Sequence, residues 1–384
     1  MRGRYRQVLL ALLAIAALGI VAYRLRRAFR SHSFSGVRMI HAVREANIWM
    51  LLAAVVLIYV CYALRARRWQ RFCFYLGPSN YWGIYNGTIM GFATIFLLGR
   101  AGEPVRPLLL ARKGKYPAAS QFGIYILERI FDFVSSAVIA MLALLVFARQ
   151  LGDAGADADS VVKAHASGGV LLALIAGAAI FLMYYRLHGA DAFGRLLGRW
   201  HSREGWRRRV AVQFLAFREG LHAIRTWGDL AWAILYSGVH WALVAGVYLI
   251  IARSFGEDFS KFNYPSAMLL LAVTMLGSVL QLPGVGGGAQ VASFIAFTTI
   301  FGVDPEPAAA AAVVLWLVTF AASLLVGVPM LLREGWSMGE LRKLAREEAA
   351  AKEAAAEEAG EMLGVDGTTG ASSEKKKDVG DALR

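Results

Sequence analysis

The sequence predicts an all-α polytopic membrane protein, and three observations lead to this fold class. Hydrophobic residues make up 58% of the 384 residues and charged residues only 18%, whereas a soluble protein carries about 25% charged residues. The apolar residues form runs close to the length of about 20 that a membrane-crossing helix needs. Arginines flank these runs, so the formal net charge of +14 indicates membrane anchoring rather than a nucleic-acid partner. We expect a multi-pass protein of the cell (inner or plasma) membrane.

Six apolar runs are expected to form full transmembrane helices. The first follows basic residues, as a signal peptide does, but no small-residue cleavage pattern ends it, so we expect a retained helix. The six runs are Val8–Tyr23, Ile48–Leu64, Phe122–Ala148, Gly168–Tyr185, Leu230–Ala252 and Ala308–Leu332.

Two further apolar segments, Tyr81–Leu98 and Tyr264–Leu282, end in glycine-rich breaks. The breaks are GRAGEP (residues 99–104) and PGVGGG (residues 283–288), and short helices are expected after them at Pro104–Arg112 and Ala289–Phe301. The second short helix would rise about 20 Å, less than the hydrocarbon core of about 30 Å. Each unit is therefore expected to form a broken, re-entrant helical hairpin.

The order helix, helix, broken hairpin, helix occurs twice. The two copies cover about residues 8–148 and 168–332 of a membrane domain expected at residues 1–333. They would have opposite orientations, which is the inverted-repeat plan of many transporters. Residues 334–384 are rich in Ala, Glu and Lys and then in small polar residues, so we expect a charged helical, then disordered, cytoplasmic tail.

Charge bias leaves the topology open. The arginine-rich segment Arg186–Arg225 is expected on the cytoplasmic side, and the acidic segment Arg149–Ser167 on the other side. If Tyr81–Leu98 re-enters, the basic residues between Arg24 and Arg44 fall outside. If it crosses, the N-terminus changes side and the cluster from Arg65 to Arg71 is misplaced instead.

No pattern of cofactor binding, metal binding or catalysis is present in the sequence. The seven histidines form no HExxH pattern, and Cys61 and Cys73 give neither a disulfide framework nor a zinc site. Gly114-Lys115 lacks the rest of a phosphate-binding loop. We therefore expect no cofactor and name no catalytic residue.

The two breaks are candidate anion sites. Pro104 suits the first position of a helix, whose free N–H groups would face the break beside Arg100 and Arg106, and the second glycine run also frees backbone N–H groups. Such groups, with guanidinium groups that bind phosphate bidentately, suit a phosphate-bearing lipid headgroup. The alternative is that the glycines serve close helix packing and that both arginines extend to the interface.

Glu128, Arg129 and Asp132 lie early in an otherwise apolar helix. Ionisable groups in such a position normally face the interior of the bundle, where they would pair with Arg100 or Arg106. The alternative is a structural cluster just inside the headgroup region. Aromatic residues expected in interfacial belts are Trp69, Trp82, Trp206, Trp227 and Trp241.

The segments GRAGEPVRPLLLARKG, ERIFDF and LPGVGGGAQVASF resemble a known family. They are similar to the flippase-like membrane domain of lysylphosphatidylglycerol synthases and its stand-alone relatives, which include archaeal proteins tied to lipid-linked glycan assembly and a group linked to hopanoid export. The resemblance covers about Val8–Arg333. Its motifs fall on Gly102, Glu103, Arg106, Glu128, Arg129, Asp132, Pro283, Gly284, Gly286 and Gly287. With Arg100, and with Gln290 where the family often has an acidic residue, these are the expected substrate-binding residues.

The resemblance implies a lipid translocator that moves a phosphate-bearing lipid or lipid-linked intermediate between leaflets. The bifunctional synthases carry a soluble aminoacyl-transfer domain where this sequence has only the charged tail, so we do not expect synthesis of aminoacyl lipid. One alternative is a polyprenyl-phosphate-dependent glycosyltransferase, or its accessory subunit, that uses Asp157 and Asp159. Another is a non-catalytic partner that recruits cytoplasmic enzymes through Arg203–Arg209 or the tail.

Overall fold

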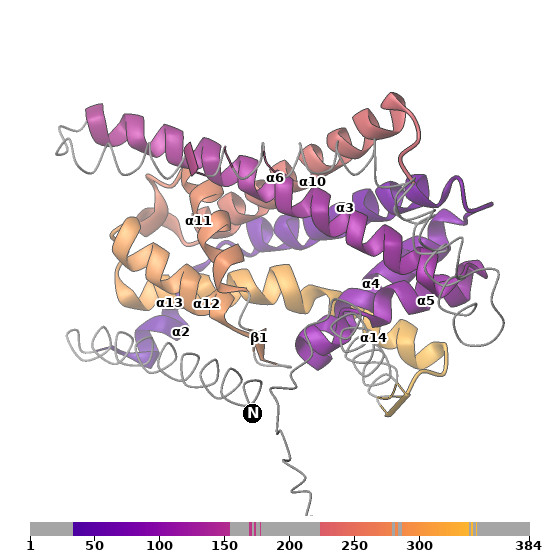
Figure 1. Cartoon of the computed structure of the whole chain (residues 1–384). Coiled ribbons are helices and arrows are strands. Elements are labelled where there is room, and N and C mark those ends of the chain that lie inside the picture. The colour runs from indigo at the N-terminus through magenta and orange to yellow at the C-terminus, as the bar shows by residue number, and fades with distance from the viewer. Residues whose placement is uncertain are drawn as a thin grey trace, which may run out of the picture. The chain divides into compact units, whose positions relative to one another are not determined.

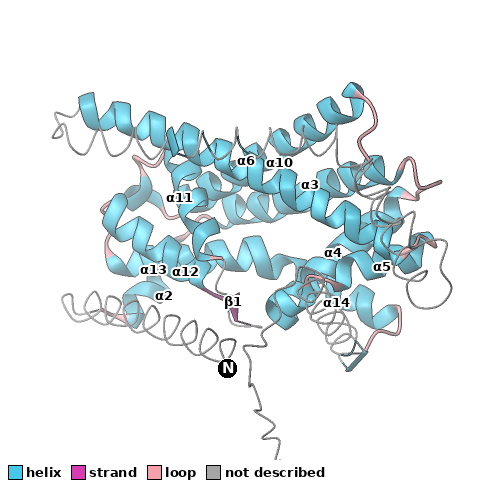
Figure 2. Ribbon diagram, in the orientation of Figure 1, coloured by secondary structure: helices cyan, strands magenta, loops and turns pink. Residues whose placement is uncertain are grey.

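The computed structural model describes residues 34–153, 169–170, 173, 177, 223–278, 281–282, 286–337, 339–340 and 343, without the side chains of Arg100, residues 147–153 and residues 281–286. These residues are almost entirely helical (Figure 2). The all-α polytopic class is confirmed.

Four helical segments are long and apolar enough to cross a membrane. They correspond to four of the six predicted runs; Val8–Tyr23 lies outside the described residues, and Gly168–Tyr185 does so for the most part. The last of the four contains a π-helical turn, η5. In Figure 1 the four run across the picture. They are α3 (Ile48–Cys73), α6 (Ala118–Asp153), α10 (Trp227–Arg253) and the continuous α13 (Pro305–Trp316), η5 (Leu317–Ala321) and α14 (Ala322–Arg333).

Helices α3 and α10 pack antiparallel and define two ends of the bundle. Asn47 caps α3 by accepting from the N–H groups of Trp49 and Met50, and a capping box of Thr226 and Asp229 starts α10. The Asn47 N–H donates to the Ser254 carbonyl at 2.8 Å, so the start of α3 lies beside the end of α10. We call this the Asn47 end, and the opposite one, where α3 finishes, the Cys73 end.

The first broken hairpin consists of α4 (Tyr81–Leu98), the 3-10 turn η1 (Gly99–Gly102) and α5 (Val105–Gly114). Gly99 has a φ of +62°, and a Cβ on Gly102 would overlap the carbonyl of Thr94, so the turn requires glycine at both places. After α5, the Tyr116 hydroxyl donates to the Pro78 carbonyl at 2.6 Å. The hairpin therefore starts and finishes at the Cys73 end, which is the re-entrant alternative of the two topologies.

The second broken hairpin starts at the Asn47 end. It consists of α11 (Tyr264–Gly277), two short strands, and α12 (Gly288–Ile295), which the π-helical turn η4 (Ala296–Ile300) extends. Phe262 packs against Phe297 and Phe301 with ring centroids 6.0 and 5.0 Å apart, and this contact joins the start of α11 to the end of η4.

The expected helix Tyr264–Leu282 is shorter than predicted. It ends at Gly277, and the chain then forms strands β1 (Gln281–Leu282) and β2 (Gly286–Gly287), in which Gln281 faces Gly287 and Leu282 faces Gly286. The backbone of residues 281–282 and 286–287 instead pairs as strands, since reversal of the chain away from water needs backbone partners. The close approach of the hairpin arms also depends on Gly277, because a Cβ there would overlap Gly288 and Ala292.

The tips of the two hairpins meet. Strand β1 lies against η1, so the two glycine breaks, about 180 residues apart in sequence, are neighbours. In Figure 1, α4 and α5 lie to the right, α11 and α12 to the left, and β1 lies between them. The hairpins thus approach each other from opposite ends of the bundle.

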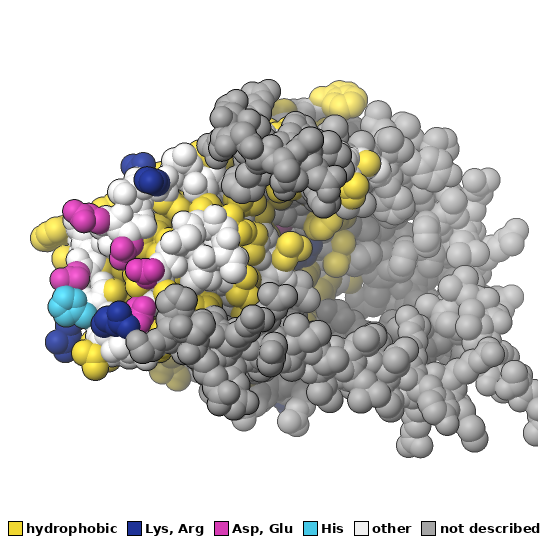
Figure 3. Space-filling model, turned by 90° about the vertical axis from the view of Figure 1, so that its left-hand side faces the viewer, with side chains coloured by type: hydrophobic (Ala, Val, Ile, Leu, Met, Phe, Trp, Pro, Cys, Tyr) yellow, Lys and Arg dark blue, Asp and Glu magenta, His cyan; other side chains and the backbone are white. Residues whose placement is uncertain are grey.

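The Asn47 end carries charges of both signs. Arg38 of α2 (Gly36–Glu45) pairs with Glu306 at 2.7 Å. Figure 3, which views this side, shows acidic and basic side chains gathered on the described surface. The exposed acidic residues here are Glu45, Glu257 and Asp258, the last two in η3 (Gly256–Phe259), and Asp304.

Candidate functional site

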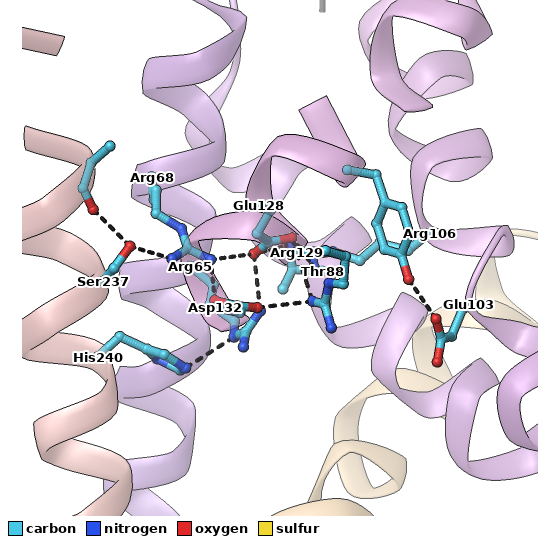
Figure 4. A network of polar contacts seen from close by, with 12 residues as sticks. Arg65, Arg68, Thr88, Glu103, Arg106, Glu128, Arg129, Asp132, Ser237 and His240 are labelled. Atoms are coloured by element: carbon cyan, nitrogen blue, oxygen red, sulfur yellow. Dashed lines mark hydrogen bonds and ion pairs between the residues drawn. The ribbon is translucent and has the colours of Figure 1, made fainter. Parts of the chain in front are cut away.

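Six ionisable side chains meet in the interior of the bundle (Figure 4). They come from α3, α5 and α6, which are far apart in sequence. We call this group the buried charge cluster; it consists of Arg65, Arg68, Arg106, Glu128, Arg129 and Asp132.

Glu128 stands at the centre of the cluster. Its Oε1 accepts from Arg65 Nη1 at 3.0 Å and from Arg68 Nη2 at 2.9 Å, and its Oε2 accepts from Arg106 Nη1 at 2.7 Å. Asp132 Oδ1 accepts from Arg68 Nη2 at 2.7 Å, and its Oδ2 lies 2.9 Å from Arg65 Nη1. These five side chains are at most 7% exposed. Their charges are therefore compensated by one another rather than by solvent.

Arg106 is enclosed by aromatic rings. Its guanidinium carbon lies 4.5 Å from the ring centroid of Trp69 and 5.4 Å from that of Phe92, and Nη2 reaches the Thr88 hydroxyl at 3.5 Å. The alternative in which Arg106 extends to the interface is therefore wrong, because the side chain is 1% exposed and paired with Glu128.

Helix α10 adds two polar side chains that the sequence did not identify. Ser237 Oγ accepts from Arg68 Nη1 at 2.6 Å, and His240 Nε2 accepts from Arg65 Nε at 3.1 Å. Because an arginine Nε is only a donor, the His240 ring accepts on Nε2 and carries its proton on Nδ1.

The prediction also missed Arg65 and Arg68, which it placed in a flanking basic segment. Helix α3 continues to Cys73, and Arg65, Arg68, Trp69 and Phe72 occupy one face at helical spacing. Apolar residues recurring on that face were the available signal. Trp69 and Trp241 were predicted to be belt residues, but Trp69 is fully buried and Trp241 is only 7% exposed. Trp82 and Trp227 are exposed as expected.

The buried charge cluster lies inside the length of its helices rather than at their ends. Arg65 is eight residues before the end of α3, and Glu128 is ten residues after the start of α6. At 1.5 Å per residue these positions lie about 12 and 15 Å from the Cys73 end, roughly half of a hydrocarbon core of about 30 Å.

Two of the predicted residues lie at the edge of the site: Glu103, which is outside the buried charge cluster, and Arg129, its most exposed member. Glu103 accepts a hydrogen bond from the Tyr125 hydroxyl at 2.6 Å. Arg129 is 40% exposed, pairs with Asp132 at 3.1 Å and lies over the ring of Tyr125. Arg100 is in η1, and its side chain is outside the described part of the chain.

Positive charge is in excess at this site. Four arginines face two carboxylates in the cluster, and Glu103 at its edge still leaves one more arginine than carboxylates. Arg129, one of the four arginines, is 40% exposed, whereas the other three arginines and both carboxylates of the cluster are at most 7% exposed. Among the buried members, three arginines therefore face two carboxylates, and buried charge without a partner is costly in a membrane. The arrangement is therefore suited to an additional anion.

The structure describes the second break only from Gly286 onward, and there one backbone N–H already has a partner. Gly286 and Gly287 belong to β2, and the Gly287 N–H donates to the side-chain Oε1 of Gln290. This N–H is occupied, so the expected anion concavity is not free at Gly287. Pro283 and Gly284 lie outside the described residues, as do Asp157 and Asp159.

Within the described residues, no group of three or more His, Cys, Asp and Glu side chains is arranged to hold a metal ion. The ion pairs of the cluster are of arginine with carboxylate.

The fold and this site define the class of protein: an all-helical, multi-pass membrane protein built around two broken hairpins whose tips meet. The chain belongs to the family described as the lysylphosphatidylglycerol synthase TM region, which matches residues 8–327. It is also similar to a UPF0104 membrane protein of Methanothermobacter thermautotrophicus, with 27% identity over 321 residues that cover 78% of this chain and 89% of the relative.

Proposed function

We propose that this protein translocates a phosphate-bearing lipid, or a lipid-linked intermediate, between the leaflets of the cell membrane. The observation that supports this most is the surplus of arginine in the buried charge cluster, which lies between membrane-length helices. Guanidinium groups bind phosphate oxygens bidentately, and a bound phosphate would supply the missing negative charge.

In this proposal Glu128 and Asp132 hold the arginines in place when no lipid is bound. The donors of Arg106 now point to Glu128, so an arriving phosphate would exchange with this carboxylate. Such an exchange keeps each charge partnered throughout the step, which lowers the cost of moving an anion through the bilayer.

The arrangement of the hairpins is compatible with alternating access. They approach from opposite ends and touch at η1 and β1, so rocking of one half against the other would open the cluster to one side at a time. Membrane or cytoplasmic enzymes that supply or use the lipid would be the partners.

Mass spectrometry of lipids that co-purify with the protein tests the proposal. We expect one phosphate-bearing class to be enriched with wild-type protein and lost with Arg106→Ala. Arg67→Ala is the matched control, because Arg67 is exposed on α3; it should retain the lipid. An identical, unselective lipid profile in all three proteins would contradict the proposal.

A further inference from the structure

A cavity lies at the Cys73 end, where the two arms of the α4–α5 hairpin open beside the start of α6. Its volume is about 170 Å³, room for roughly five water molecules at about 30 Å³ each. Cys73, Asn80 and Gln121 are among the residues that line it, whereas none of the residues of the buried charge cluster does.

Gln121 is a buried amide in the lining of this cavity. The side chain is fully buried, and its Oε1 accepts from the indole Nε1 of Trp69 at 2.9 Å. An indole N–H only donates, so the amide oxygen must face Trp69 and the NH₂ group must face away. Among the described residues, the acceptor recorded for this NH₂ is the Cys73 sulfur at 3.5 Å. A thiol is a weak acceptor, so a buried two-donor group is left incompletely satisfied.

The lining is also cationic. Lys113 and Lys115 belong to it, and it contains no acidic residue. Helix α4 starts directly after Asn80, and α6 starts shortly before Gln121, so both helices have their positive ends here. The negative end of helix α5 also lies here and would repel an anion. The Lys115 N–H, however, caps the carbonyls of Ala111 and Arg112. Lys113 pairs with Glu334, which is not a lining residue.

We infer that this cavity binds the phosphate group of a lipid headgroup. Gln121 donates to a phosphate oxygen, and Lys113 and Lys115 neutralise the charge at the rim. Trp82 and Phe74 are 65% and 60% exposed at the same end of the bundle, as expected for residues at the interface of a bilayer.

The inference deepens the proposed function and rests on it for the identity of the substrate. Trp69 joins the two sites, because its N–H donates to Gln121 and its ring faces the Arg106 guanidinium at 4.5 Å. The cavity is thus a first binding site at the Cys73 end, and Trp69 separates it from the buried charge cluster.

Two variants change the cavity. Gly83→Leu fills it, and the new Cβ meets only the Cβ of Asn80 at an ordinary 3.8 Å. Gln121→Glu keeps an oxygen for Trp69 but replaces the NH₂ donor by a second oxygen. The matched control for the first is Gly238→Leu, since a Cβ on Gly238 meets nothing within 4 Å. Lys261→Gln, an exposed lysine at the Asn47 end, is the control for Lys115→Gln.

The measurement is calorimetric titration of the purified full-length protein, in neutral detergent, with dihexanoyl phosphatidic acid. We expect binding to be weakened about ten-fold or more by Gly83→Leu and Gln121→Glu, as for loss of a hydrogen bond to a charged group. Lys115→Gln should weaken it less, and the two controls should leave it unchanged. Dihexanoylglycerol, which lacks the phosphate, should not bind.

Three outcomes separate the explanations. Equal binding by wild type and both cavity variants overturns the inference. Full competition by inorganic phosphate at matched concentration identifies free phosphate as the ligand and overturns the lipid assignment. In the third outcome, the cavity variants lose binding, but the co-purifying lipids are unselective and do not change in Arg106→Ala. This result supports the cavity site and contradicts the proposed translocation.

Discussion

Glu128 holds three arginines from two other helices in one buried position. Each of its carboxylate oxygens accepts at least one charge-assisted hydrogen bond, and its side chain is 1% exposed. Removal of the negative charge would leave Arg65, Arg68 and Arg106 close together with only Asp132 to compensate them. Such uncompensated buried charge is among the costliest changes a protein can undergo.

We therefore expect Glu128→Gln to lower the free energy of unfolding by about 3 kcal/mol or more. The measurement is thermal unfolding of the purified protein in detergent. Glu257→Gln, at an exposed position in η3, is the control and should change stability little. An unfolding temperature for Glu128→Gln equal to that of the control would show that the carboxylate is not ionised in the native state.

We expect lipid binding by Arg106 to depend on the planar guanidinium group as well as on its positive charge. Lysine in its place keeps the charge but cannot donate bidentately or stack in the same way on Trp69. We predict that Arg106→Lys loses the co-purifying phosphate-bearing lipid nearly as completely as Arg106→Ala does, while Arg67→Lys keeps it. Quantitative lipid mass spectrometry makes the comparison, and full retention by Arg106→Lys would mean that charge alone suffices.

Spacing in the sequence led to part of this site. Glu128 and Asp132, four residues apart on one helix, were expected to face inward and to pair with Arg100 or Arg106. Both are buried, and Glu128 pairs with Arg106, whereas Asp132 pairs with Arg65 and Arg68. Arg65, Arg68, Ser237 and His240 were missed. A basic residue at the end of an apolar run is usually an anchor, and only the packing of α3 against α6 and α10 turns two such arginines into the core.

The two breaks need glycine for different structural reasons. Gly102 is required because a side chain there would overlap the backbone of α4 at Thr94, whereas Gly287 has a φ of +136° at the start of α12. The breaks are therefore built to reverse the chain closely.

Gly102→Ala should destabilise the α4–η1–α5 hairpin. Since the new methyl group meets backbone rather than a movable side chain, we expect a loss of about 1–3 kcal/mol in thermal unfolding. Gly238→Ala makes the same chemical change in open space within α10 and should be neutral or stabilising by up to about 1 kcal/mol. Equal stability of the two variants would contradict the close contact between α4 and η1.

Gln290 acts on the backbone at the start of α12. Because its Oε1 accepts from the Gly287 N–H, Gln290→Leu should cost about 1 kcal/mol, as for loss of a helix cap, while Gln290→Glu keeps the acceptor and should cost less. Paired unfolding curves in detergent test this order. If the leucine variant is as stable as the glutamate variant, the side chain has no capping role.

The bundle as a whole has its polar residues divided between two ends and a buried centre. Arg65 and Arg68 are both buried. They therefore do not belong to the loop charges from which the topology is inferred. The remaining conflict in the charge bias therefore concerns only the residues from Arg24 to Arg44, of which Arg38 is paired with Glu306 at the Asn47 end.

Accessibility to a membrane-impermeant thiol reagent tests this arrangement. In a variant without Cys61 and Cys73, we predict that Phe74→Cys and Lys115→Cys react from the same side of sealed vesicles. Lys261→Cys should react from the opposite side, because the α11–α12 hairpin starts at the Asn47 end. The three positions are exposed. Labelling of Phe74→Cys and Lys115→Cys from opposite sides would show that Tyr81–Leu98 crosses the membrane.

Composition and hydropathy were sufficient for the fold class, for four helices of membrane length and for the two breaks, because a bilayer imposes helix length and apolarity directly on each segment. The tertiary structure decided the end at which each hairpin returns, the early termination of α11 and the membership of the buried charge cluster. These features depend on contacts between segments far apart in the chain, such as Arg65 with His240 and β1 with η1. A local pattern shows that an arginine or a glycine is unusual, but only packing determines its partner.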